Sequence, residues 1–264
     1  MPYFASYLTL PMTKNYQPTI KILAEDFEIP QLEKKRRITA LLPYDYEETK
    51  ISYPVLYLQD GQNLFDENAP FGNWAIDRSL GEFAKTNNKI IVVAIDHGDR
   101  ERINEYTPFY KSKFGRPQGK DYMRFVSETL KPYIDKNFRT LPDREHTGLG
   151  GSSLGGLISI YGGIVYPHIF SKLMIFSPSL WIEPRLHIDV IKYFEPQDAK
   201  MYLYAGGSES KNLVMNVQRF KQSVEQVSQD RANFDIHLAL NPEGTHNEYF
   251  WQLEFPKALK WLYF

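Results

Sequence analysis

Apolar residues along the chain follow two different spacings. In Ile90–Ile95 six apolar residues stand side by side, which is typical of a strand covered on both faces of a sheet. In other segments apolar residues recur every three or four positions, which is typical of helices that pack on one side. The first pattern predicts strands at Thr19–Leu23, Arg37–Leu42, Val55–Gln59, Ile90–Ile95, His146–Gly150, Lys172–Phe176, Met201–Ala205 and Asp235–Leu240. The second predicts helices at Ala75–Lys85, Tyr122–Asn137, Leu154–Tyr166, Leu213–Gln229 and Tyr249–Leu262.

The order of these elements indicates the fold class. The first two strands follow each other without a helix, so we expect an antiparallel pair at the edge of the sheet. From Val55 onward strands and helices alternate, which predicts a mostly parallel sheet of about eight strands with helices on both faces. A chain of 264 residues is long enough to bury a large core, and we expect residues 1–264 to form a single α/β domain.

Two segments interrupt the alternation. Asp96–Gly119 is long, polar and aromatic, and Ser177–Gln197 contains three prolines around Trp181. Each follows the carboxyl end of a predicted strand, where open α/β sheets bind their ligands. Long loops in compact domains are more often functional than disordered, so we expect both insertions to shape a binding site.

Composition and charge exclude several classes of function. The net charge is −1 and no run of Lys or Arg could form a patch for nucleic acid. The chain has no cysteine, which excludes disulfides, thiolate catalysis and cysteine-based zinc sites. No apolar run reaches the length of a membrane span and the first residues do not resemble a signal peptide, so we expect a cytoplasmic protein without a membrane partner. A homodimer is only the base-rate expectation.

One turn carries the strongest chemical signal. Gly150–Gly156 contains the pattern Gly-x-Ser-x-Gly at Gly151, Ser153 and Gly155, between a predicted strand and a predicted helix. A nucleophile elbow needs this context, because a tight turn aims the serine and leaves no room for side chains two residues away. A reading centred on Ser152 would need glycine where Leu154 stands. The alternative is a flexible Gly/Ser turn, and the matching flanks favour the elbow over it.

A serine nucleophile needs a base and an acid that orients the base. His246 lies between the last predicted strand and the last predicted helix, whereas His97 is a weaker candidate. Glu209 follows the strand Met201–Ala205, and the order serine, acid, histidine is that of α/β-hydrolases. The non-catalytic alternatives are a polar loop histidine for His246 and a solvated helix-capping acid for Glu209.

An oxyanion formed at the serine needs hydrogen-bond donors. We expect one to be the backbone N–H of Leu154, at the start of the helix after the elbow. The other should come from the loop after Val55–Gln59, where Gly61 permits a close turn and the N–H of Gln62 is our candidate. Asp60 in the same loop is expected to hold the turn together.

These motifs resemble the putative esterase family of the α/β-hydrolases, the group with esterase D and enterochelin-esterase-like proteins. The matching pieces run in the expected order from about residue 20 to the C-terminus: Val55–Asp66, Arg102–Pro108, Gly150–Leu157, Ser177–Trp181 and Gly244–Asn247. The resemblance implies a Ser153, His246 and Glu209 triad, no metal and no required cofactor. It also implies that Arg102, Glu105 and Tyr106 help to build the wall of the site, and that Asn63, Arg102, Tyr106 and Trp181 bind substrate. The structural alternatives are a salt-bridged corner for the three wall residues and a core position for Trp181.

The sequence therefore predicts a serine carboxylic-ester hydrolase that works through an acyl-enzyme on a small-molecule ester, with a small or aromatic acyl group. Two alternatives remain open from the sequence. An acyltransferase would use the same three residues, and a catalytically silent domain of the same fold would only bind.

Overall fold

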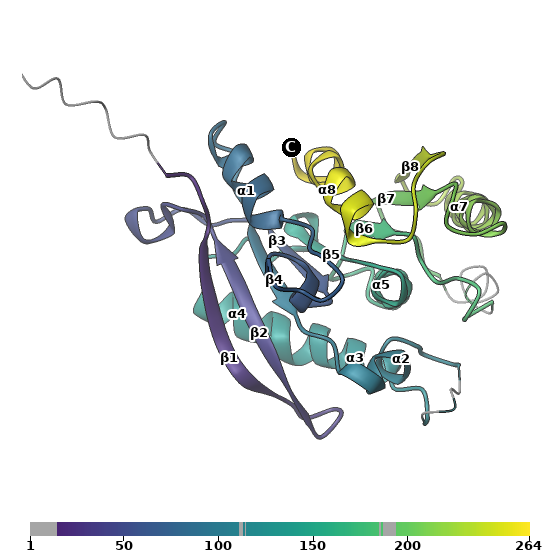
Figure 1. The fold of residues 1–264 in the computed structure, drawn as a ribbon, viewed down its shortest axis with the longest axis horizontal. Coiled ribbons are helices and arrows are strands. Elements are labelled where there is room, and N and C mark those ends of the chain that lie inside the picture. The colour runs from purple at the N-terminus through teal and green to yellow at the C-terminus, as the bar shows by residue number, and fades with distance from the viewer. Residues whose placement is uncertain (1–14, 111–112, 114, 185, 187–193) are drawn as a thin grey trace, which may run out of the picture.

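The computed structural model describes residues 15–110, 113, 115–184, 186 and 194–264. Its centre is one sheet with the strand order β1-β2-β4-β3-β5-β6-β7-β8 (Figure 1). β2 pairs antiparallel with β1 and with β4, and the remaining pairs are parallel. The predicted mostly parallel sheet with an antiparallel N-terminal edge is confirmed. The strands are β1 (Thr19–Ile29), β2 (Lys34–Leu42), β3 (Val55–Gln59), β4 (Ile91–Ile95), β5 (Thr147–Ser152), β6 (Lys172–Phe176), β7 (Ala199–Gly206) and β8 (Phe234–Asn241).

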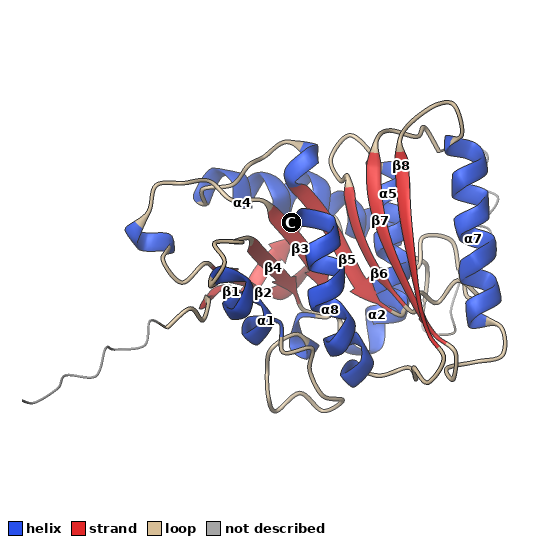
Figure 2. Ribbon diagram, turned by 90° about the horizontal axis from the view of Figure 1, so that it is seen from above, coloured by secondary structure: helices blue, strands red, loops and turns tan. Residues whose placement is uncertain are grey.

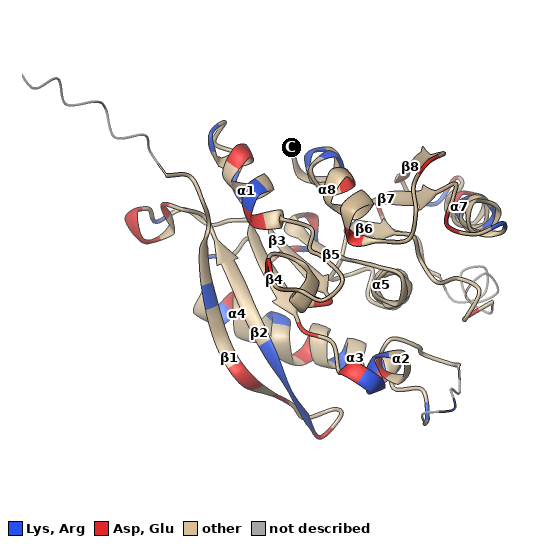
Figure 3. Cartoon of the chain, viewed as in Figure 1, with Lys and Arg blue, Asp and Glu red and all other residues tan. Residues whose placement is uncertain are grey.

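Helices cover both faces of the sheet. Figure 2 shows α8 in front of the strands and α5 behind them. α1 and α8 pack on one face, while α3, α4, α5 and α7 pack on the other. α5 has no charged residue, as Figure 3 shows, because nearly all of it is buried. The helices are α1 (Ile76–Ala84), α2 (Arg102–Glu105), α3 (Gly119–Arg124), α4 (Lys131–Asn137), α5 (Leu154–Val165), α7 (Leu213–Ser228) and α8 (Glu248–Tyr263).

The structure corrects several predicted boundaries. β1 continues six residues beyond Leu23 to Ile29, and most of its side chains are exposed, so no apolar run marked its second half. His146 does not begin a strand but ends a short 3₁₀ turn that Asp143 caps. The predicted helix Tyr122–Asn137 is divided by a π-helical turn at Phe125–Leu130. Pro132 follows this turn, and the missing N–H of proline removes a regular helical hydrogen bond there.

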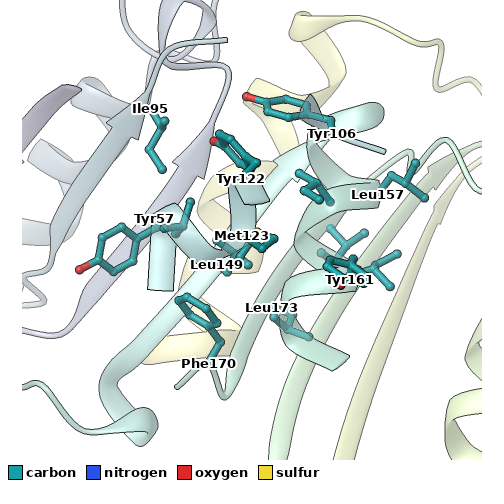
Figure 4. Close-up of a cluster of buried hydrophobic side chains, with 14 of the residues drawn as sticks. Tyr57, Ile95, Tyr106, Tyr122, Met123, Leu149, Leu157, Tyr161, Phe170 and Leu173 are labelled. Carbon is teal, nitrogen blue, oxygen red and sulfur yellow. The ribbon is translucent and has the colours of Figure 1, made fainter. Parts of the chain in front are cut away.

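Two hydrophobic clusters hold the helices to the sheet. The larger lies under α3, α4, α5 and α7, and Figure 4 shows part of it around Tyr57, Leu149 and Leu157. The second lies under α1 and α8 and is centred on Trp74. The Trp74 ring is 5.2 Å from Phe176 and 6.1 Å from Trp251 between ring centroids. Trp251 also reaches the loop edge of the sheet, so this cluster supports the site described below.

The carboxyl ends of the parallel strands meet at one edge of the sheet. The predicted insertion 96–119 contains the short helix α2, and residues 111–112, 114, 185 and 187–193 of the two insertions lie outside the described part of the chain. The insertions touch each other at this edge: the buried Glu183 carboxylate accepts hydrogen bonds from the N–H groups of Phe109 (2.9 Å) and Tyr110 (2.5 Å).

In the described residues no helix is both long and apolar enough to cross a lipid bilayer.

Candidate active site

Ser153 occupies a strained turn between β5 and α5. Its φ of 56° and ψ of −120° lie in a region that non-glycine residues rarely adopt. The turn is held by the Ser153 N–H, which donates to the Phe176 carbonyl at 2.9 Å. A Cβ on Gly155 would lie 2.7 Å from an Asp60 carboxylate oxygen and 3.0 Å from Gln59 Cβ, so only glycine fits there. The structure thus gives a packing reason for the glycine after the serine.

His246 and Glu209 form a close pair. The Nδ1 atom of His246 lies 2.6 Å from Glu209 Oε2. The Glu209 side chain is only 2% exposed, whereas that of His246 is 43% exposed. Because Nδ1 faces the carboxylate, the Nε2 atom is the nitrogen left to receive a proton from another group.

The Glu209 carboxylate has further donors that hold it in place. Its Oε1 atom accepts hydrogen bonds from Ser177 Oγ at 2.6 Å and from the Gly206 N–H at 2.8 Å. Ser177 in turn accepts a hydrogen bond of 3.0 Å from the indole N–H of Trp251. Trp251 also packs edge-on against His246, with 5.0 Å between ring centroids. Trp251 and Ser177 therefore orient both members of the pair, as outer partners do in many sites.

Ser153 and His246 line the same hollow, of about 330 Å³. Among the described contacts the Ser153 hydroxyl is 3.1 Å from the Ser179 hydroxyl, and none joins it directly to His246. Asp60, Asn63, Phe71, His97, Arg102, Ser152, Glu248 and Trp251 complete the lining.

Both proposed oxyanion donors lie at turns next to the elbow. Leu154 is the first residue of α5, so its N–H has no carbonyl partner within the helix. Gln62 lies in a 3₁₀ turn, and its side-chain amide exchanges two hydrogen bonds with the backbone of His97, at 2.9 and 3.2 Å. This amide ties the end of β3 to the end of β4. A Cβ on Gly61 would lie 2.5 Å from an Asp96 carboxylate oxygen, which explains the glycine before it.

Asp60 and Arg102 form a two-pronged ion pair at the wall of the hollow. The guanidinium donates from Nε at 2.6 Å and from Nη2 at 2.8 Å to the two carboxylate oxygens. Burial alone would lower the pKa of Arg102, but the charge and hydrogen bonds of Asp60 outweigh it and raise that pKa. Arg102 therefore keeps its charge. The Asp60 side chain makes no cap hydrogen bond in its own turn, so its contact joins that turn to Arg102 of α2.

The structure places the four predicted substrate residues in different surroundings. Asn63 and Arg102 line the hollow. Tyr106 does not, because it is fully buried, with the Arg102 guanidinium 5.2 Å from its ring centroid. A direct substrate contact of Tyr106 stays a prediction, and in this structure its ring packs against Arg102. The neighbouring Glu105 is the salt-bridged corner, since its buried carboxylate pairs with Arg36 at 2.8 Å.

Trp181 is also placed away from the serine. Its side chain is 70% exposed, so it is not a core residue. It lines a separate hollow of about 540 Å³ beside Arg219 of α7. Trp181 is not among the residues that line the hollow of Ser153, and the expectation that it flanks that pocket stays a prediction.

Several residues at the site were missed by reasoning from the sequence. Glu248 and Phe71 line the hollow, and Ser177 and Trp251 hold the pair of Glu209 and His246. Ser177 lies in a segment already noted for its resemblance to the esterases, and Glu248 follows His246 by two residues. Neither signal says where a side chain points. Within the described part of the chain, no three His, Asp or Glu side chains are grouped to hold a metal ion.

Comparisons with known proteins give the family of the chain and its fold. A family model described as putative esterase matches residues 29–262. An uncharacterized protein of Bacillus subtilis, YbbA, is 26% identical over 240 residues, which cover 86% of this chain and 92% of the relative. Among solved structures, the enterobactin esterase of Shigella flexneri superposes with a TM-score of 0.73 at 18% identity, over 94% of this chain and 60% of that one.

A second solved structure matches almost end to end. A ferulic acid esterase superposes with a TM-score of 0.69 at 18% identity, over 95% of this chain and 99% of that chain. At these identities the likeness shows the fold, which is that of the α/β-hydrolase-type esterases.

Proposed function

Because the chain belongs to the putative esterase family, we propose that it is a serine carboxylic-ester hydrolase that works through an acyl-enzyme. The observation that carries the proposal is the 2.6 Å contact between His246 Nδ1 and the buried Glu209 carboxylate, beside the hollow that Ser153 lines. This contact leaves His246 Nε2 as the base. The family and its esterase neighbours support ester hydrolysis as the class of reaction.

The proposed reaction has two halves. In the first, His246 Nε2 takes the proton of the Ser153 hydroxyl while Ser153 Oγ bonds to the ester carbonyl carbon. The tetrahedral oxyanion is held by the N–H groups of Leu154 and Gln62. When this intermediate collapses, the bond to the alcohol oxygen breaks and His246 returns the proton to the leaving alcohol. Ser153 is then left as an acyl ester.

In the second half a water molecule replaces the alcohol. His246 takes a proton from the water, whose oxygen attacks the acyl carbon. The bond to Ser153 Oγ then breaks, His246 gives the proton back to Ser153, and the carboxylic acid leaves. The buried Glu209 stabilises the protonated imidazole in both halves. The hollow of about 330 Å³ is at the small end of ligand sites, which favours a small ester or a single aromatic acyl group.

The test uses p-nitrophenyl acetate and a fluorophosphonate probe. We expect Ser153→Ala to abolish hydrolysis and covalent labelling together, and mass spectrometry should find the label of the unmodified protein on Ser153. Ser152→Ala is the matched control, and it should still be labelled because Ser152 is the last residue of β5 and not the aimed one. Hydrolysis that survives in Ser153→Ala would refute the proposal.

A further inference from the structure

A carboxylate that the proposed chemistry does not use lies in the pocket of Ser153. Glu248 is the first residue of α8, and Asn247 caps that helix just before it. The residue is 8% exposed, yet it lines the hollow shared with Ser153 and His246. Burial raises the pKa of Glu248 above its usual value, the Asp60 charge adds to this effect, and His246 and Arg102 oppose it. The group therefore lies in a poorly hydrated part of the pocket.

Glu248 has much unused capacity to accept hydrogen bonds. An ionised carboxylate offers about four lone-pair positions. The side-chain donor to it is Asn63 Nδ2 at 3.4 Å, which is a long hydrogen bond, and the backbone N–H of Glu248 itself is a further donor. The Nε and Nη2 atoms of Arg102 both donate to the Asp60 carboxylate. Among the described residues no cation lies within ion-pair distance of Glu248.

The same pocket also holds a histidine, His97, whose Nδ1 atom has a hydrogen-bond partner. The His97 Nδ1 atom accepts a hydrogen bond of 3.0 Å from the Asp99 N–H. In the neutral ring the proton must then be on Nε2, and His97 lines the hollow. An acceptor, Glu248, and a donor, His97, therefore both line the hollow of Ser153.

We propose that Glu248, with His97, selects esters that carry a free hydroxyl group near the scissile bond. A hydroxyl group can donate to the Glu248 carboxylate and accept from His97 Nε2–H at once, whereas a hydrocarbon leaves both groups unpaired. An ammonium group can only donate, and the charged Arg102 in the same wall opposes it. The inference rests on the proposed esterase function, for which it names the substrate class.

Matched esters test this selection. One pair places the hydroxyls on the alcohol side: glycerol 1-monoacetate against propyl acetate. The other places one on the acyl side: methyl 3-hydroxybutanoate against methyl butanoate. We expect the protein to prefer the hydroxylated member of at least one pair by about ten- to hundredfold in kcat/KM, the range of a hydrogen bond to a charged group. The pair that shows the preference identifies the side of the ester that Glu248 reads.

Substitutions of Glu248 separate recognition from a structural role at the helix start. In Glu248→Leu the preference should fall to near one, and in Glu248→Gln, which keeps an acceptor oxygen, it should be intermediate. Glu243→Gln removes one negative charge from the exposed loop before His246 and should keep the full preference. If the substitution only disturbed the start of the helix, kcat/KM would fall equally for both esters of a pair, and the ratio of the two values would stay unchanged.

Three results would overturn the inference. The first is a wild-type ratio near one for both pairs, and the second is a ratio that Glu248→Leu does not change. The third is a preference for acetylcholine over 3,3-dimethylbutyl acetate that Glu248→Gln abolishes, since this would assign the carboxylate to a cation. These results leave the esterase proposal standing as long as hydrolysis of p-nitrophenyl acetate depends on Ser153. If that dependence is missing, the proposed function fails first.

Discussion

Glu209 shows how much a single side chain at this site depends on its neighbours. Its carboxylate is 2% exposed and receives Ser177 Oγ–H, the Gly206 N–H and His246 Nδ1. Every one of these atoms can donate a hydrogen bond, so the environment suits a charged acceptor and no other group.

Glu209→Gln keeps the shape of the side chain and removes its charge. The Gln amide would accept from Ser177 and Gly206 and turn its NH₂ toward His246 Nδ1. The imidazole would then carry its proton on Nε2, where the proposed base must be empty. We expect kcat on p-nitrophenyl acetate to fall by about 10³- to 10⁴-fold, the loss typical of a wrong tautomer. Steady-state kinetics measures this loss.

The control for this variant is the exposed acid Glu243, two residues after Asn241 at the end of β8. Glu243→Gln should keep kcat within a factor of about two, because a surface charge is screened. Equal activity of Glu209→Gln and the unmodified protein would show that the acid of the site lies elsewhere.

At the level of single residues the sequence predicted one part of the site and missed another. Chain order and strand ends restrict where a serine, an acid and a histidine can meet, and the structure brings Ser153, Glu209 and His246 together as expected. Trp251, Ser177 and Glu248 were missed because their contacts join segments far apart in the chain, such as Ser177 and Trp251. Tyr106 was assigned to substrate because a motif records which residue is present and not whether it is buried.

At the level of elements, glycines decide how closely β5 can be packed. A Cβ on Gly150 would lie 2.7 Å from the backbone oxygen of Met174 and 2.8 Å from its Cβ, so the neighbouring strand β6 would have to move. The glycine Gly81 of α1 differs, because a Cβ there would meet only the amide of Gln17, an exposed side chain that can turn away.

These two glycines predict opposite effects of the same substitution. Gly150→Ala should destabilise the protein by about 1–3 kcal/mol, the cost of overpacking against a backbone that cannot shift freely. Gly81→Ala should stabilise it by up to about 1 kcal/mol, because alanine is the better helix former. Urea unfolding measures both changes. A Gly150→Ala protein as stable as Gly81→Ala would mean that β5 and β6 are less tightly packed than the structure indicates.

The accuracy of the predicted elements follows the strength of their apolar pattern. β3, β4 and β6 are buried runs, and their predicted bounds differ from the observed ones by at most one residue. β1 was cut short because its side chains are mostly exposed and its pairing with β2 decides its length. The π-helical turn before Pro132 was not expected, since the periodicity of the helix continues through it.

At the level of the whole molecule, the sheet separates two clusters that meet only through its strands. Trp74 and Trp251 are buried in the cluster under α1 and α8, and Trp261 packs against it. Trp181 is 70% exposed and changes its surroundings little on unfolding. Tryptophan fluorescence therefore reports mainly one face of the sheet, whereas far-ultraviolet circular dichroism reports all helices.

This asymmetry tests whether both faces unfold together. Ile134 of α4 is fully buried in the cluster on the opposite face, so Ile134→Ala should cost about 2–5 kcal/mol. Most strands of the sheet have side chains in both clusters, and each remaining strand is paired with such a strand. We therefore expect the urea midpoints measured by fluorescence and by circular dichroism to fall together. Leu259→Ala, in the cluster under α8, is the matched control and should shift both midpoints in the same way. A fluorescence midpoint unchanged by Ile134→Ala would show that the two faces unfold as separate units.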